Sequence, residues 1–185
     1  MPTCCLTAPR RPAALSSGFS AVELLVEIAI AALLMALAMP SFGTLVSRYR
    51  LRHAADDLSA AIYLARAEAL RRGGNVTLRG ATAPGCSDAD DWSCGWLVFE
   101  DADNDGVLAP DEKRIQVWPA PRGILVTPNF PRASTYLNMN RWGRFQNLSA
   151  FSFTFKSAVD RDDAAARVLC MSAGGRIRTG EGDKC

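Results

Sequence analysis

The chain has 185 residues, a formal net charge of +2 at pH 7 and 49% hydrophobic residues. This length suffices for one membrane helix and one soluble domain with a proper core. The net charge is too small to indicate a nucleic-acid or membrane partner by itself, so such a partner must be argued from local clusters. With one histidine, no nucleophile motif and no phosphate-binding loop, the sequence predicts that the protein is not an enzyme.

The N-terminal segment joins a basic leader to an apolar run. The run from Val22 to Met39 is apolar except for Glu23 and Glu27. A carboxylate in lipid costs roughly 2.5 kcal/mol or more, so an acid in such a run needs a reason. One interpretation is a secretory signal peptide with its cleavage box at residues 36–38, and a second is a plain single-span anchor.

A third interpretation rests on a family pattern. The stretch GFSAVELLVEIAIAALLMALAMPSF resembles the start of a type IV prepilin or pseudopilin, with Gly18, Phe19, Glu23 and Pro40 at the family's positions. The resemblance implies that a prepilin peptidase cleaves between Gly18 and Phe19 and methylates the new N-terminus of Phe19. It also implies that Glu23 pairs with the N-terminal amine of a neighbouring subunit, where opposite charges attract strongly in low dielectric. Glu27 departs from the pattern, which has an apolar or hydroxyl residue there.

A helical pattern resumes after the proline. Apolar residues recur at steps of four and three from Leu51 to Ala69, and charged residues occupy the opposite face. Gly73-Gly74 then stops the helix, so we expect one continuous helix of roughly 80 Å from Phe19 to Arg72. The segment RYRLRHAADDLSAAIYLARAEALRRG resembles the GspH/FimT/FimU branch of the family. The chain thus divides into a cleaved leader (1–18), a transmembrane helix (19–40), its amphipathic continuation (41–74) and a β-rich head (75–185).

The rest of the chain is predicted to form strands and turns. Six short segments are rich in β-branched or aromatic residues: 75–79, 96–100, 113–118, 124–127, 151–156 and 167–172. Phe151, Phe153 and Phe155 alternate with polar residues, which gives one buried and one wet face. The economical architecture is an α+β fold, an antiparallel sheet packed on the C-terminal half of one long helix. It is also the type IV pilin fold that the resemblance implies.

Four cysteines remain after two are lost with the leader. An even number outside the cytoplasm favours disulfides. Of the three pairings, Cys86–Cys94 and Cys170–Cys185 close the shortest loops. A tetracysteine zinc site is the alternative, although the sequence contains no Cys-x-x-Cys pair.

Residues 101–112 fit a calcium-loop pattern. Asp101, Asp103, Asp105 and Glu112 stand at loop positions one, three, five and twelve, with a glycine at position six. Oxygen ligands at this spacing can wrap a Ca²⁺ ion, and no other cofactor is expected. The flanking segments, however, predict strands rather than the paired helices of an EF-hand. Asp-Asn-Asp-Gly is also an ordinary hairpin turn, so both interpretations stay open.

Gly175-Arg176-Ile177-Arg178 is a second local motif. On a strand, Arg176 and Arg178 project together and Ile177 turns inward. Two adjacent guanidinium groups suit phosphate oxygens. The motif resembles the Gly-Arg-x-Arg element of FimT-like minor pilins, which bind DNA during natural transformation, so the resemblance implies double-stranded DNA as a partner. The alternative is a solvated edge strand whose arginines prevent association between sheets.

The resemblance leaves two assembly systems open. As a FimT/FimU-like minor pilin, the protein would join a tip or priming complex of a type IV pilus. As a type II secretion pseudopilin of the H kind, it would sit in a pseudopilus that drives protein secretion. Both place a single-pass helix in the bacterial inner membrane before assembly and the head in the periplasm, with other pilins or pseudopilins contacting the N-terminal helix. Pro40 with Ser41-Phe42 resembles the pilus branch, and so does the Gly-Arg-Ile-Arg motif. A calcium-binding adhesin on a membrane stalk is a weaker third interpretation.

Overall fold

The structure is a computed structural model that describes residues 19–82, 86, 91–131, 134–146, 149–159 and 166–185, with only the backbone for 37–42. The expected leader, including Gly18, lies outside the described residues. The chain divides into two compact units, Met1–Phe42 and Gly43–Cys185. We describe each unit by itself.

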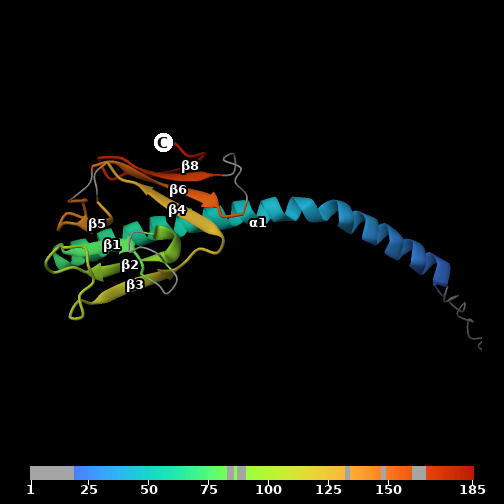
Figure 1. Cartoon of the computed structure of the whole chain (residues 1–185), viewed down its shortest axis with the longest axis horizontal. Coiled ribbons are helices and arrows are strands. Elements are labelled where there is room, and N and C mark those ends of the chain that lie inside the picture. Colours follow the sequence, from blue (N-terminus) through green and yellow to red (C-terminus); the bar gives the residue numbers. More distant parts are fainter. Residues whose placement is uncertain (1–18, 83–85, 87–90, 132–133, 147–148, 160–165) are drawn as a thin grey trace, which may run out of the picture. The chain divides into compact units, whose positions relative to one another are not determined.

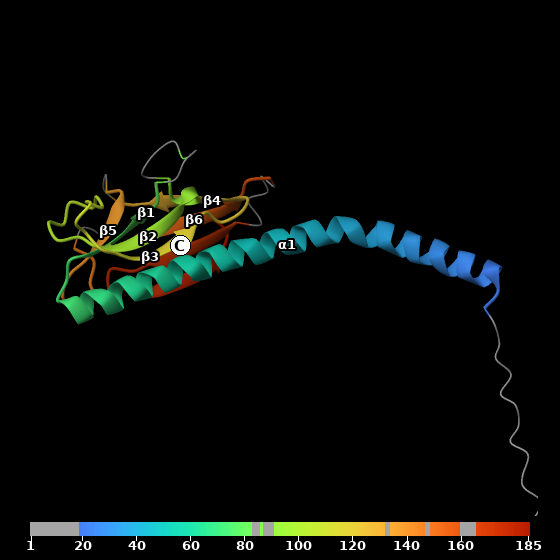
Figure 2. The same cartoon turned by 90° about the horizontal axis from the view of Figure 1, so that it is seen from below.

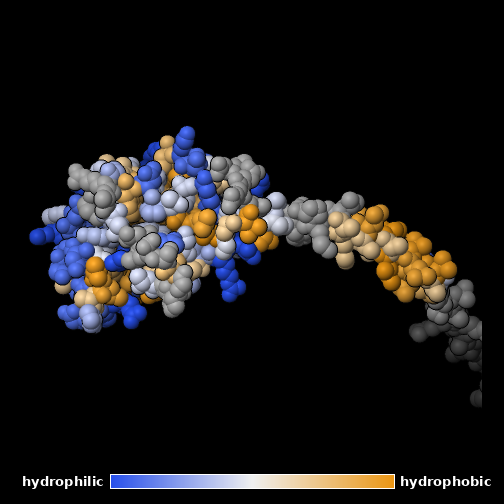
Figure 3. All heavy atoms as spheres, in the orientation of Figure 1, coloured by the Kyte–Doolittle hydropathy of each residue, from blue (hydrophilic) through white to orange (hydrophobic). Residues whose placement is uncertain are grey.

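Helix α1 (Ala21–Arg72) has 52 residues and matches the expected long helix (Figure 1). In the first unit the described side chains from 21 to 36 are all exposed, and most are apolar (Figure 3). Within the described ranges, no helix meets the length and apolarity expected of a membrane span. In the second unit the helix ends at Gly73 and Gly74, whose N–H groups donate to the Ala69 carbonyl at 2.9 and 2.8 Å. Both glycines have positive φ, which is the expected glycine stop.

The second unit contains two antiparallel four-stranded sheets. The first sheet has the order β3-β2-β1-β5, with β1 (Val76–Gly80), β2 (Gly95–Glu100), β3 (Arg114–Pro119) and β5 (Tyr136–Met139). The second has the order β4-β6-β7-β8, with β4 (Ile124–Asn129), β6 (Phe151–Ser157), β7 (Arg167–Met171) and β8 (Ile177–Glu181). A short 3₁₀ helix, η1 (Trp92–Cys94), precedes β2.

All six predicted strands are present, which confirms the α+β architecture with an antiparallel head. The difference from the expectation is the division into two sheets, and the chain first passes from one to the other between β3 and β4. Pro119 and Pro121 stand there and have no N–H group to continue a ladder, and Gly123 follows with a φ of 69°. The chain therefore leaves the first sheet here for β4, returns to it for β5, and joins the second sheet again from β6.

The core of the second unit lies between α1 and the inner faces of the sheets. Figure 2 shows α1 running along one side of the strands. Leu58 and Ile62 of the helix and Phe153 and Phe155 of β6 are fully buried there. Ser152 is also buried, although we expected it on a wet face. It stands opposite Cys170 on β7, and the disulfide described next covers that side of the strand.

The structure contains both disulfides that the loop lengths suggested. Cys86 and Cys94 are joined with a Cα–Cα distance of 6.1 Å, and Cys170 and Cys185 with one of 5.7 Å. The second bond ties the last residue of the chain to β7, beside β8.

Candidate functional site

The Gly-Arg-Ile-Arg motif lies at the edge of the second sheet, because among the described strands β8 pairs with β7 alone. Arg176 precedes the strand and Arg178 belongs to it, and both side chains are exposed. Ile177 is half-buried and packs against the core. The alternation predicted for a strand is therefore present.

Gly175 is required by the turn before this strand. Its φ is 80°, and a Cβ atom there would lie 2.8 Å from Nη2 of Arg66. Arg66 comes from α1; its Nη2 lies 3.5 Å from the Met171 sulfur, and its guanidinium carbon lies 5.0 Å from the Phe145 ring centroid. Burial lowers the pKa of Arg66, an effect that Tyr63 opposes. Gly175 of the motif thus packs against Arg66 of α1, a contact that the sequence did not predict.

Arg176 and Arg178 line one recess of about 700 Å³. Asn129, Ser152 and Cys185 are among its other lining residues. Among the described residues, neither guanidinium group has a hydrogen-bond or ion-pair partner. Both cations are therefore available to a ligand.

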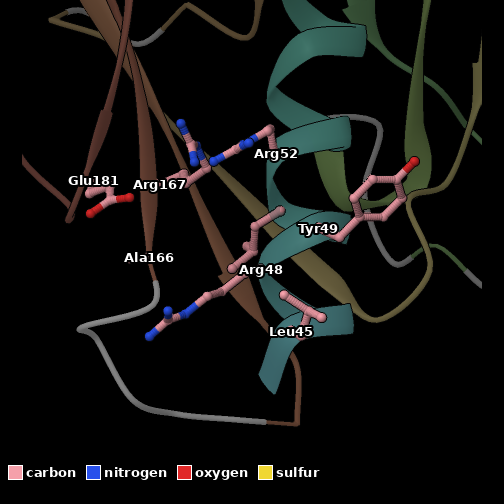
Figure 4. Close-up of a pocket in the computed structure, with 8 residues that line it drawn as sticks. Leu45, Arg48, Tyr49, Arg52, Ala166, Arg167 and Glu181 are labelled. Atoms are coloured by element: carbon pink, nitrogen blue, oxygen red, sulfur yellow. The ribbon is translucent and has the colours of Figure 1, made fainter. Parts of the chain in front are cut away.

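A second basic group lies farther along the same strand pair. Arg48 and Arg52 of α1 and Arg167 of β7 line a pocket of about 360 Å³, together with Glu181 of β8 (Figure 4). Arg167 is paired in register with Glu181, and Arg178 lies three residues before that position, roughly 10 Å along the strand. The sequence spacing of Arg48 and Arg52 predicts a shared helix face, but nothing in the sequence joins them to Arg167.

Trp142 and Arg144 form a further feature, whose position the sequence could not give. They line a recess of about 500 Å³ together with Gly175 and Arg66, and the Trp142 side chain is 71% exposed. Trp142 and Arg144 therefore extend the exposed surface next to the Gly-Arg-Ile-Arg motif.

The candidate calcium loop joins β2 to β3, so its flanks are strands as the sequence predicted. One carboxylate oxygen from each of Asp101, Asp103 and Asp105 lies within 4.8 Å of the others. Glu112 is not in this group. Its Oε1 accepts a hydrogen bond from the Ala102 N–H at 2.8 Å, and its Oε2 accepts one from the Ala109 N–H at 2.9 Å. The structure therefore brings together three of the four expected ligands, and the fourth holds the loop backbone.

The N-terminal residues with expected roles are described in part. Phe19 and Glu23 are both exposed in the single chain, and Glu23 lies in the first turn of α1. A carboxylate is favoured there by the helix dipole, whatever else it contacts.

Comparison with known proteins identifies the family. The model of the family described as "Type II transport protein GspH" matches residues 54–175, about two thirds of the chain. The chain belongs to the GspH family. No match was found among the curated proteins.

Two solved structures share the fold of this GspH-family chain. The type IV minor pilin FimU of Pseudomonas aeruginosa (strain PAO1) is 22% identical, with a TM-score of 0.53 over 72% of this chain and 90% of FimU. The minor pseudopilin EpsH from the type 2 secretion system of Vibrio cholerae is 11% identical, with a TM-score of 0.51 over 71% of this chain and 97% of EpsH. The chain is thus a minor pilin or pseudopilin of the GspH family, whose members assemble with other pilins or pseudopilins at the cell envelope.

Proposed function

We propose that this protein is a minor pilin of a type IV pilus, part of a tip or priming complex, and that the edge formed by β8 binds double-stranded DNA. The observation that supports DNA binding best is the pair Arg176 and Arg178. Both are exposed, both line one recess, and neither has a partner among the described residues.

The charges along β8 suit a phosphate backbone. Duplex DNA carries one negative charge per about 1.7 Å of its axis, so several cations along one edge can each meet a phosphate. Arg176 and Arg178 would supply two such contacts, whereas Arg48, Arg52 and Arg167 line a pocket on the other face of the sheet, because Arg178 and Glu181 are three residues apart on β8. Contacts of this kind hold DNA without reading its sequence. We therefore expect binding that depends on salt more than on base sequence.

The N-terminal segment supplies the assembly part of the proposal. We expect cleavage between Gly18 and Phe19, methylation of Phe19, and pairing of Glu23 with the N-terminal amine of a neighbouring subunit. Before assembly, residues 19–40 would lie in the inner membrane with the head in the periplasm. The exposed apolar side chains of residues 21–36 support this proposal, because an apolar surface of that size needs lipid or other subunits around it.

A pseudopilin of a type II secretion system is the second candidate. The description of the matching family and the likeness to EpsH support it. Deletion of the gene separates the two candidates. Loss of pili and of DNA uptake, with normal secretion of exoproteins, is expected for the minor pilin, and the reverse result would favour the pseudopilin.

The DNA proposal is tested with the full chain in detergent micelles. Duplex affinity is measured by fluorescence anisotropy at several salt concentrations for the wild type and for Arg176→Gln/Arg178→Gln. Loss of two phosphate contacts should lower the slope of log K against log salt by about 1.8, with a weaker affinity at every salt concentration.

The matched control is Lys113→Gln/Arg114→Gln, which removes two exposed cations at the edge strand of the other sheet. This control should keep the wild-type slope. Equal losses in both double variants would show that only net charge matters, and an unchanged slope in the Arg176/Arg178 variant would refute the proposed edge.

A further inference from the structure

The carboxylate of Asp101 is buried without full compensation. The residue is 0% exposed. Its Oδ2 accepts hydrogen bonds from the Thr77 hydroxyl at 2.6 Å, the Gly106 N–H at 3.1 Å and the Asn138 side-chain amide at 3.5 Å. Its Oδ1 accepts none within the described residues, and Asp101 takes part in none of the described ion pairs. A buried charge is costly unless it is paired with an opposite charge or a metal.

Two further carboxylates converge on this buried one. Asp103 and Asp105 are both exposed, and one carboxylate oxygen of each lies within 4.8 Å of the other and of Asp101. Three negative groups at this separation repel one another. The Arg79 guanidinium donates to the Gly106 carbonyl of the loop at 2.6 Å, and none of the described ion pairs joins a cation to these carboxylates. A divalent cation between the three carboxylates would offset their repulsion and would give the buried Asp101 carboxylate the opposite charge that it lacks.

The backbone of the β2–β3 loop is already held in place beside the three carboxylates. Gly106 has a φ of 77°, and a Cβ atom there would lie 2.3 Å from the Tyr136 ring. Glu112 fastens the N–H groups of Ala102 and Ala109 and so keeps the two ends of the loop together. A loop held in this way loses little further freedom when an ion binds, which favours binding.

We propose that the loop between β2 and β3 binds one Ca²⁺ ion through Asp101, Asp103 and Asp105, with Glu112 closing the loop. Main-chain carbonyl groups and water would complete the coordination, since Ca²⁺ takes six to eight oxygen ligands. Three carboxylates on a loop suit Ca²⁺ better than Mg²⁺, which keeps most of its water and demands a strict octahedron. The inference does not depend on DNA binding or on the choice between pilus and secretion system.

Ion binding would also join elements of the first sheet. Asp101 already contacts Thr77 of β1, and the Asn138 side chain of β5 donates to Thr77 Oγ1 and to Asn104 Oδ1, both at 2.9 Å. An ion on Asp101 therefore stabilises the contact between the β2–β3 loop and strands β1 and β5. We expect calcium to raise the melting temperature of the head.

The test measures calcium bound to the full chain in detergent micelles by equilibrium dialysis, and the melting temperature with and without the ion. The expected result is one ion per chain with a Kd of about 10⁻⁴–10⁻³ M, the range of extracellular modules. Asp103→Asn/Asp105→Asn should weaken binding at least about tenfold and abolish the thermal shift. The asparagine oxygens can still accept from the N–H groups of residues 105 and 107, so the fold is kept.

Asp56→Asn/Asp57→Asn is the matched control, because it removes two exposed acids from α1 with the same change of charge. It should bind calcium as the wild type does. The proposal is overturned if the wild type binds no ion at about 10 mM calcium, well above the expected Kd. It is also overturned if the Asp103/Asp105 variant binds with wild-type affinity, or if magnesium gives the same thermal shift at the same concentration.

Discussion

Two stretches of helix α1, residues 51–69 and residues 21–36, have the same backbone conformation but different surroundings. Between Leu51 and Ala69 an apolar face is buried against the chain's own sheets, and polar residues cover the rest. Between residues 21 and 36 every described side chain is exposed, although most are apolar. The first stretch is explained by the fold of a single chain. The second is explained only by an environment outside the chain, so changes in the two stretches should have separable effects.

The largest expected effect is on assembly, from Glu23→Gln. If Glu23 pairs with a neighbouring N-terminal amine, removing one partner of a buried pair costs about 3–5 kcal/mol per contact. Filament assembly, followed by electron microscopy or by shearing of surface pili, should be lost while the melting temperature of the head stays the same. Glu27→Gln is the control, since it removes an equal charge one turn away, and equal damage from both variants would argue against a specific role for Glu23.

The next effect is on the stability of the head. Leu58 is fully buried in the core, so Leu58→Ala should lower the free energy of unfolding by about 2–5 kcal/mol, measured by urea denaturation. Leu25 is 66% exposed, and Leu25→Ala should change the same quantity by less than about 0.5 kcal/mol. A large loss of head stability from Leu25→Ala would contradict the separation of the two stretches.

The smallest expected effect comes from an ion-pair group at the end of the buried stretch. Glu68 accepts hydrogen bonds from Arg71 and Arg72, which lower its pKa to about 2, and Arg72 also pairs with Glu100 of β2 at 2.6 Å. A carboxyl group with a lowered folded-state pKa stabilises the fold above its unfolded pKa of 4.5 and loses this contribution as the pH falls towards 2.

Glu68→Gln should therefore cost about 1 kcal/mol at pH 7, discounted for solvent screening, and almost nothing near pH 2. Thermal melts of both proteins across this pH range provide the measurement. A constant difference between variant and wild type down to pH 2 would show that the ionised form of Glu68 is not what stabilises the helix end.

The local signals in the sequence account for much of the fold. The helix, its glycine stop and six strands follow from periodicity and turn residues, because these are properties of neighbouring residues. Strand β5 was not foreseen, because Asn138 interrupts its apolar pattern and is accommodated by hydrogen bonds that include those to Thr77, Asn104 and Asp101. Such partners are distant in the sequence and become visible only in the folded chain.

The candidate sites show the same limit. The acidic motif at residues 101–112 and the basic motif at residues 175–178 could be found because the residues of each lie close together in the sequence. The burial of Asp101 could not, because it depends on packing against Thr77 and Asn138 from other strands. The grouping of Arg167 with Arg48 and Arg52 likewise depends on how β7 packs beside the helix.

The Cys170–Cys185 bond bears on when the recess beside Arg176 and Arg178 is completed. It fastens the last residue beside β8, where Cys185 lines the same recess as Arg176 and Arg178. Because such bonds form in oxidising compartments, the proposed transfer of the head to the periplasm would come before the recess takes its final form. In a head that is still exposed to cytoplasmic reductants, Cys185 would not be bonded to Cys170. The recess would then lack this tether and the head would be an immature form of the protein.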